Sequence, residues 1–256
     1  MNSMHVSVAS LTGLFFASFL LALADRFISK KYVNNIKGFL CDRSSCDHCG
    51  TTIPFYYNIP LAGYIISLGH CRSCNNRISP RYPLSEAYGL ILALFSLYRF
   101  GFNIQALIFF STVAVCSAVV YADIKTMEIP DSLLCVLIVA GILFALNGGF
   151  TKDSWLGLAS AGGAFALFLV VFPGSFGTGD LKFAALLGFF TGFQFVIVML
   201  ETALITGSIF GAVYAITSGR GLRIKIPFAP FIAIGYIIAI LYGADILILY
   251  HNAFAP

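Results

Sequence analysis

Two aspartates stand at the ends of long apolar segments, where carboxylates are rare in this sequence. Asp123 follows an apolar run that ends at Ala122, and Asp180 closes a Gly-Thr-Gly-Asp motif directly before the apolar Leu181. A carboxylate at a membrane boundary is costly to desolvate, so each requires a function or a partner. Two facing carboxylates can share one proton, and one then acts as a base toward water while the other acts as an acid toward a carbonyl group. The pair therefore indicates aspartyl protease chemistry.

The residues around the two aspartates permit this chemistry, but a structural role is equally open. Gly177 and Gly179 let the backbone beside Asp180 approach other segments closely and adopt conformations closed to most residues. Short glycine motifs also recur by chance. The alternative is therefore that Asp123 and Asp180 are solvated acids at the membrane boundary.

Three further acids near apolar segments have other expected roles. Asp131 follows Pro130, which fits the start of a helix, so we expect Asp131 at an N-cap or in a first turn. Glu86 is expected in the first turn of a helix, where the helix dipole favours an acid. Glu201 lies nearer the middle of a helix, where it could line a polar interior, pair with another buried group or be protonated.

Four of the seven cysteines form two Cys-x-x-Cys knuckles, separated by 21 residues: Cys46, Cys49, Cys71 and Cys74. Each knuckle supplies two thiolates, and the spacer can fold back to bring the pairs around one tetrahedral cation. Four thiolates leave no open coordination position, so we expect a structural zinc ion. Disulfides are the main alternative, and a reducing cytoplasm disfavours them, whereas redox chemistry would need one reactive knuckle. Cys41 lies near the first knuckle and is expected to be a spare thiol, with the role of a substitute ligand as the alternative.

The elements that hold these groups must be membrane helices. Of the 256 residues, 59% are hydrophobic and only 10% are charged. A soluble domain has about a quarter charged residues, so this composition excludes a soluble globular enzyme and makes the lipid bilayer the expected surroundings. The net charge is only +4 and no long basic run occurs, which gives no support for nucleic-acid binding.

Apolar segments of suitable length predict an all-α membrane protein with about eight transmembrane helices. The segments are 6–24, 84–98, 103–122, 132–147, 155–172, 181–192, 195–217 and 227–250. A span needs about 20 residues, so 181–192 must be tilted or set deep in the bundle, and seven spans remain the alternative. The first segment lacks a small-residue cleavage site and is expected to be a retained helix.

The positive charges indicate how the helices are oriented, because Lys and Arg accumulate in cytoplasmic loops. With the loop 25–83 in the cytoplasm, 13 of the 15 Lys and Arg residues are cytoplasmic and only Arg99 and Lys152 are not. Asp123 and Asp180 then also lie at the cytoplasmic face. The expected organisation is a first membrane helix in 1–24, a cytoplasmic cysteine loop in 25–83 and a membrane domain carrying the aspartates in 84–256.

In the order and spacing of its motifs, the chain resembles the bacterial type IV prepilin peptidases, which also process type II secretion pseudopilins. Besides the two knuckles, the motifs are Asn58-Ile59-Pro60-Leu61, Arg81-Tyr82-Pro83-Leu84 with Glu86, Asp123 with Asp131, Gly-Thr-Gly-Asp180 with Lys182, and Ile226-Pro227-Phe228-Ala229-Pro230. The chain departs from the family pattern at three places, and the first is the segment 34–41, which lacks the tryptophan and proline that often precede the first knuckle. Asp47 replaces a frequent proline and Ala229 a usual glycine, which bears on loop shape and substrate selectivity.

The resemblance implies a protease of the Gly-x-Gly-Asp class in the bacterial inner membrane, with Asp123 and Asp180 in the catalytic positions. Its substrates would be pilin or pseudopilin precursors, cut on the cytoplasmic side after the glycine that precedes the hydrophobic pilin helix. Many members also methylate the new N-terminus with S-adenosylmethionine, and a cysteine-rich loop is typical of them, so methyltransferase activity is expected too. The sequence has no Rossmann glycine-rich turn, and it assigns no residue to the methyl donor.

Two functions of other classes remain as alternatives. In a small transporter, Asp123, Asp180 and Glu201 would carry protons or cations through the bundle. Both aspartates lie at one face and no inverted repeat relates the two halves of the chain, which disfavours transport. The second alternative is a zinc-loop scaffold that recruits pilus assembly proteins without cleaving them.

Overall fold

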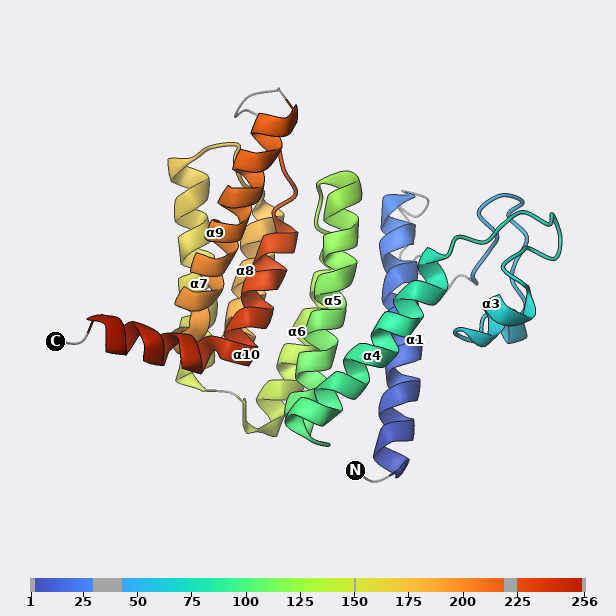
Figure 1. The fold of residues 1–256 in the computed structure, drawn as a ribbon, viewed down its shortest axis with the longest axis horizontal. Helices are drawn as coiled ribbons and strands as arrows, with labels where there is room; N and C mark the ends of the chain where they lie inside the picture. The colour runs from blue at the N-terminus through green and yellow to red at the C-terminus, as the bar shows by residue number, and fades with distance from the viewer. Residues whose placement is uncertain (1–2, 30–42, 150, 219–224, 255–256) are drawn as a thin grey trace. The chain divides into compact units, whose positions relative to one another are not determined.

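The computed structural model describes residues 3–29, 43–149, 151–218 and 225–254, and this part of the chain is helical without a named strand (Figure 1). The long helices are α1 (Ser3–Ile28), α4 (Arg81–Phe100), α5 (Ile104–Thr126), α6 (Asp131–Phe144), α7 (Lys152–Val171), α8 (Thr178–Thr191), α9 (Phe193–Ser218) and α10 (Ala229–Phe254). Short turns of helix are η1 (Phe55–Tyr57), α3 (Ala62–Ile66) and η2 (Ala145–Gly149). The predicted all-α fold is confirmed, and each of the eight predicted apolar segments coincides with one long helix.

Within the described part of the chain, six helices are long and apolar enough to cross a membrane: α1, α5, α6 with η2, α7, α9 and α10. The 14 residues of α8 extend only about 21 Å, which is less than the bilayer core of about 30 Å. The 20-residue helix α4 carries Arg81, Glu86 and Arg99. The chain is therefore a multi-pass membrane protein in which α8 is too short to span unaided.

The chain divides into two compact units, Met1–Ala114 and Val115–Pro256. In the first unit α1 and α4 approach closely through small residues. A Cβ atom added at Gly89 would overlap the Cβ of Ala17 and the carbonyl oxygen of Gly13. Membrane helices associate through such small residues because these let the backbones pack closely. The contact therefore fixes α4 against α1.

We expect Gly89→Val to lower the free energy of unfolding by about 1–3 kcal/mol or more, because the added methyl groups must push α1 away from α4. Gly163→Val is the matched control, since a Cβ there meets no atom within 4 Å. Both positions lie in helices, so the two variants share the effect of valine on a helix. Thermal unfolding in detergent checks the prediction, and an equal loss of stability in the two variants would contradict it.

The second unit surrounds the short helix α8 with longer ones. α8 contacts α6, α7, α9 and α10, and six of its residues are buried (Figure 1). Gly157 of α7 and Gly188 of α8 lie so close that neither leaves room for a Cβ atom. This burial explains how a helix with too few residues to span is kept inside the bundle, as predicted for 181–192.

Candidate functional site

Asp123 lies at the C-terminal end of α5 with only 4% of its surface exposed. Its Oδ2 atom accepts a hydrogen bond of 3.0 Å from the backbone N–H of Ala229, the first residue of α10. The first N–H groups of a helix lack partners within the helix and favour a negative charge. The start of α10 therefore orients the Asp123 carboxylate and stabilises its ionised form.

Asp180 is the third residue of α8, outside the six helices that can span a membrane. Its Oδ2 atom accepts a hydrogen bond of 2.8 Å from the N–H of Gly177, so the side chain also caps the helix. Burial raises the pKa of Asp180 to about 6, against the lowering effect of the Gly177 N–H, and the charge of Asp123 raises it further. The two aspartates are therefore close enough to affect each other's ionisation.

Packing between two segments brings the aspartates together. A Cβ atom on Gly179 would lie 3.0 Å from the Cβ of Ile129, so the glycine permits close contact with the segment that follows Asp123. Lys182 Nζ and Asp131 Oδ1 form an exposed ion pair of 2.8 Å between the same two segments. Exposed pairs contribute little free energy, so the glycine contact is the main constraint.

Aromatic rings pack beside the two polar segments. The ring of Phe176, directly before Gly177, lies edge-on to that of Phe228, directly before Ala229, with centroids 4.9 Å apart. Phe165 of α7 contacts both rings, at 5.6 Å and 6.0 Å, and is almost fully buried. Such pairs stabilise the positions of the segments they join. The cluster therefore links the start of α8 to the start of α10.

This arrangement can support general acid–base chemistry. Asp123 is a buried carboxylate that accepts an N–H bond, and Asp180 is an acid whose pKa is raised toward neutrality. Groups with different proton affinities can act as base and acid on the same water and carbonyl. The sequence motifs pointed to both aspartates, but they contained no sign that a backbone N–H of Ala229 would orient one of them.

The other acids have structural partners. Asp131 lies in the first turn of α6 directly after Pro130, as predicted. Glu201 accepts a hydrogen bond of 2.8 Å from the hydroxyl of Tyr250, which is exposed, so the expected pairing with another buried group is not what the structure shows. The prediction for Glu86 was wrong, because α4 begins at Arg81 and no acid lies in its first turn. Glu86 is instead buried one turn further along.

The four knuckle cysteines converge on one point in the first unit. Their sulfur atoms all lie within 4.8 Å of one another, with Cys46 to Cys74 at 3.8 Å and Cys49 to Cys71 at 3.9 Å. All four are free thiols, since these distances are far longer than the disulfide bond of about 2.05 Å. Sulfur atoms on a tetrahedral zinc ion, each about 2.3 Å from the metal, are about 3.8 Å apart. The geometry fits a tetrahedral metal.

Hydrogen bonds favour the thiolate, the form that binds metal, at two of the four cysteines, Cys49 and Cys71. The pKa of Cys74 is instead raised to about 11, because the lowering effect of the Asn76 backbone is outweighed by burial and by the three neighbouring thiols. The hydroxyl of Thr51, 3.3 Å from Cys49 Sγ, contributes most to lowering the pKa of Cys49 to about 6. The backbone N–H groups of Cys74 and Ser73 lower the pKa of Cys71. Several thiolates this close repel one another unless a cation lies between them. Cys41 lies outside the described residues.

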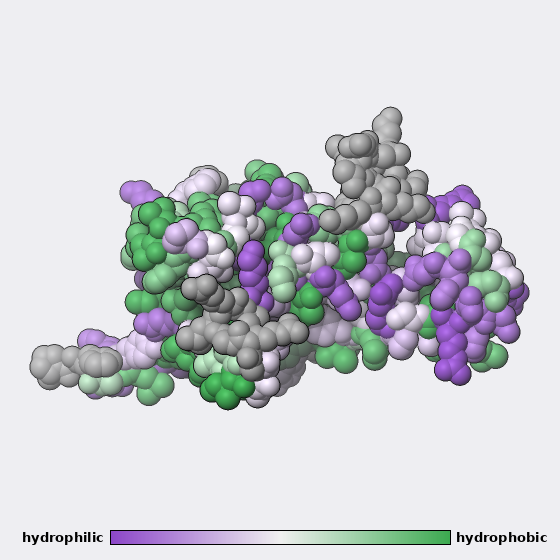
Figure 2. All heavy atoms as spheres, turned by 90° about the horizontal axis from the view of Figure 1, so that it is seen from above, coloured by the Kyte–Doolittle hydropathy of each residue, from purple (hydrophilic) through white to green (hydrophobic). Residues whose placement is uncertain are grey.

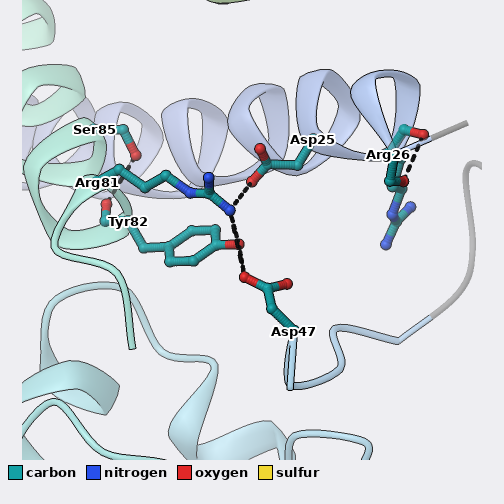
Figure 3. Close-up of polar contacts among 7 residues, drawn as sticks. Asp25, Arg26, Asp47, Arg81, Tyr82 and Ser85 are labelled. Atoms are coloured by element: carbon teal, nitrogen blue, oxygen red, sulfur yellow. Dashed lines mark hydrogen bonds and ion pairs between the residues drawn. The ribbon is translucent and has the colours of Figure 1, made fainter. Parts of the chain in front are cut away.

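Arg81 joins the cysteine module, residues 43–80, to the two long helices of the first unit (Figure 3). Its Nη2 atom lies 3.4 Å from Asp25 of α1 and 3.4 Å from Asp47 of the first knuckle. The Tyr82 hydroxyl donates a hydrogen bond of 3.3 Å to the same Asp47 oxygen. Asp47, which departs from the proline of the family pattern, therefore attaches the knuckle to the start of α4.

Comparisons with known proteins cover both units. A sequence model described as the bacterial peptidase A24 N-terminal domain matches residues 11–100, and one described as the type IV leader peptidase family matches residues 107–244. A protein named prepilin leader peptidase/N-methyltransferase from Legionella pneumophila is 31% identical, over 80% of this chain and 74% of its own. A protein of the same name from Bacillus subtilis is 33% identical, over 82% and 86%. No solved structure matches the chain significantly.

Proposed function

Because the chain belongs to the type IV leader peptidase family, we propose that it removes the leader peptide from type IV prepilins or type II secretion pseudopilins, with Asp123 and Asp180 as its catalytic pair. The observation that carries the proposal is the meeting of three separated segments at these aspartates. Asp123 accepts the N–H of Ala229, and Gly179 packs on the segment after Asp123. Membership of a peptidase family also argues against the two alternative functions, a transporter and a scaffold that does not cleave.

In the proposed mechanism Asp123 is the base and Asp180 the acid. Asp123, whose carboxylate accepts the N–H at the start of α10, takes a proton from water, which attacks the scissile carbonyl carbon. Asp180, whose pKa is raised to about 6 by burial, donates a proton to the carbonyl oxygen when it is in its protonated form. The resulting tetrahedral intermediate has no covalent bond to the enzyme. In the collapse Asp123 gives its proton to the leaving nitrogen and Asp180 takes back the hydroxyl proton, which breaks the peptide bond and restores both groups.

We propose that the reaction takes place at the cytoplasmic face of the inner membrane. The distribution of Lys and Arg supports this orientation, with 13 of 15 on the side that carries both aspartates and the cysteine module. A precursor whose leader is polar and whose following helix is apolar would present the bond between them at this boundary. The substrate would therefore meet the aspartates without leaving the bilayer.

We propose that Cys46, Cys49, Cys71 and Cys74 hold a structural zinc ion and that the protein also methylates the new N-terminus. The sulfur distances and the lowered pKa of Cys49 support the metal. The N-methyltransferase part of the relatives' name supports the second activity. S-adenosylmethionine would supply the methyl group, and the zinc ion would fix the fold of the module.

One experiment separates these activities. Purified protein is incubated with a prepilin precursor, with and without S-adenosylmethionine, and the product N-terminus is weighed by mass spectrometry. We expect shortened pilin in both samples and the mass of one added methyl group only with the donor. Unchanged precursor in both samples would refute the peptidase proposal, and shortened pilin without the methyl group would refute the methyltransferase proposal.

We expect cleavage to decline as the pH rises through about 6. Asp180 must be protonated to act as the acid, and its pKa is raised to about 6, so its protonated fraction is high below this pH and falls about tenfold per unit above it. The measurement is kcat/KM for one precursor as a function of pH. A decline centred instead near the ordinary pKa of an aspartate would contradict the acid role.

A further inference from the structure

The chain between the two knuckles is uncharged and exposes apolar side chains. No Asp, Glu, Lys or Arg occurs between Asp47 and Arg72. This segment contains η1 and α3, and its large exposed hydrophobic residues are Phe55, Tyr56, Ile59, Ile65, Ile66 and Leu68. Phe55 and Leu68 are 85% and 82% exposed, and Ile65 is 68% exposed. We call these six residues the α3 patch.

Hydrogen bonds to Glu86 set the position of this segment along α1. Glu86 is buried, and its two oxygens accept bonds of 2.8 Å from the Ser18 hydroxyl and 2.7 Å from the Leu61 N–H. Asp25 is the first acid after the apolar run of α1, and Ser18 precedes it by seven residues. At 1.5 Å per residue, Leu61 is therefore held about 10 Å deeper than Asp25 along α1.

The backbone at Leu61 shows that this position is constrained. Leu61 has φ 59° and ψ −49°, in a γ-turn closed by a bond of 2.7 Å from the Ala62 N–H to the Pro60 carbonyl. This conformation is rare and strained for a residue with a side chain, and it persists only where the surroundings enforce it. Glu86 supplies that constraint, and α3 begins directly after the turn.

The depth of Leu61 along α1 and the apolar side chains of the α3 patch both indicate contact with the bilayer. A depth of about 10 Å below the first acid of α1 corresponds to the boundary between lipid headgroups and acyl chains. Figure 1 draws α3 level with the middle of α1, and Figure 2 shows mainly hydrophilic side chains on the module when seen from the end where α1 finishes. The apolar part of the module is therefore directed toward the bilayer.

We propose that the α3 patch is a membrane-inserted surface, in contact with lipid in the leaflet at the Asp25 end of α1. The lipid-facing surface of α1, which exposes Leu11, Phe15 and Phe19, belongs to the same unit and extends to this depth. Aromatic rings are favoured at this boundary, and Arg72, stacked 4.6 Å over Tyr57, can reach lipid phosphates. The cysteine module is then attached to the membrane through its own side chains. This inference holds for either orientation of the chain and does not rest on the proposed function.

The test uses tryptophan fluorescence in reconstituted proteoliposomes. Trp155 is the only tryptophan of the chain, so Trp155→Phe gives a dark background. Ile66→Trp and Phe55→Trp each place a probe on the α3 patch, and Asn76→Trp places one at an exposed polar position just after the second knuckle. Each variant is titrated with lipids brominated near the headgroup and, separately, with aqueous acrylamide. Circular dichroism and gel filtration select folded samples.

We expect brominated lipid to quench the Ile66→Trp and Phe55→Trp variants at least about twofold more than Asn76→Trp, and acrylamide to give the reverse order. Strong acrylamide quenching of both patch variants would show that the patch faces water and would overturn the proposal. Protection from both quenchers would show that protein covers the patch, for example a second copy of the chain, and would overturn it equally. The two patch positions make the result independent of a local effect of either substitution.

Discussion

Asp123→Asn and Asp180→Asn are each expected to lower the rate of precursor cleavage by about 10²–10⁴-fold, and to leave membrane insertion intact. Asparagine keeps the size of the side chain and an oxygen that can accept a hydrogen bond. It can therefore still bind the N–H of Ala229 at position 123 or of Gly177 at position 180. What it loses is the titratable carboxyl group that takes up and releases a proton, so a lower rate would report chemistry and not helix capping.

The control for these variants is Asp131→Asn. Asp131 is exposed and pairs with Lys182 on the same two segments, so the substitution removes a nearby carboxylate without touching the proposed pair. We expect a change in cleavage of only a few fold, in line with the small contribution of exposed ion pairs. Initial rates at equal amounts of folded protein give the comparison. Normal cleavage by either Asp123→Asn or Asp180→Asn would refute the proposed dyad.

The positions of the helices could be predicted because hydrophobic length is a property of the chain itself. The segment 181–192 was recognised as too short to span, and α8 is indeed a 14-residue helix buried among four others. Asp123 and Asp180 were also recognisable, since acids are few and both stand at the ends of apolar runs. These features depend on composition and on the spacing of nearby residues, and both can be read from the sequence without knowing the fold.

The partners of those residues could not be predicted in the same way. The N–H of Ala229 comes from 106 residues beyond Asp123, and a backbone donor leaves no mark in a residue pattern. Glu86 was misplaced because α4 begins before Pro83, not after it. A proline is tolerated in a first helical turn, where its missing N–H would have no partner. Pro227 is compatible with a helix that starts nearby, but it does not show that this helix begins beside Asp123.

Replacing Cys46 and Cys74 together by serine is expected to remove the zinc ion and to abolish methyl transfer, while cleavage continues at a similar rate. Two of four sulfur ligands are lost, and the remaining pair cannot close a tetrahedral site. The cysteines and the two aspartates belong to different units of the chain, so we expect cleavage to continue without the metal. The module itself should become looser and more readily cut by proteases.

Cys135→Ser is the matched control, because Cys135 is a free and exposed cysteine of α6 outside the cluster. Metal analysis, proteolysis of the module and the mass of the pilin product measure the three effects separately. Full zinc content in the double variant would refute Cys46 and Cys74 as ligands. Equal loss of cleavage and methylation would show instead that cleavage by the aspartate pair also depends on the folded cysteine module.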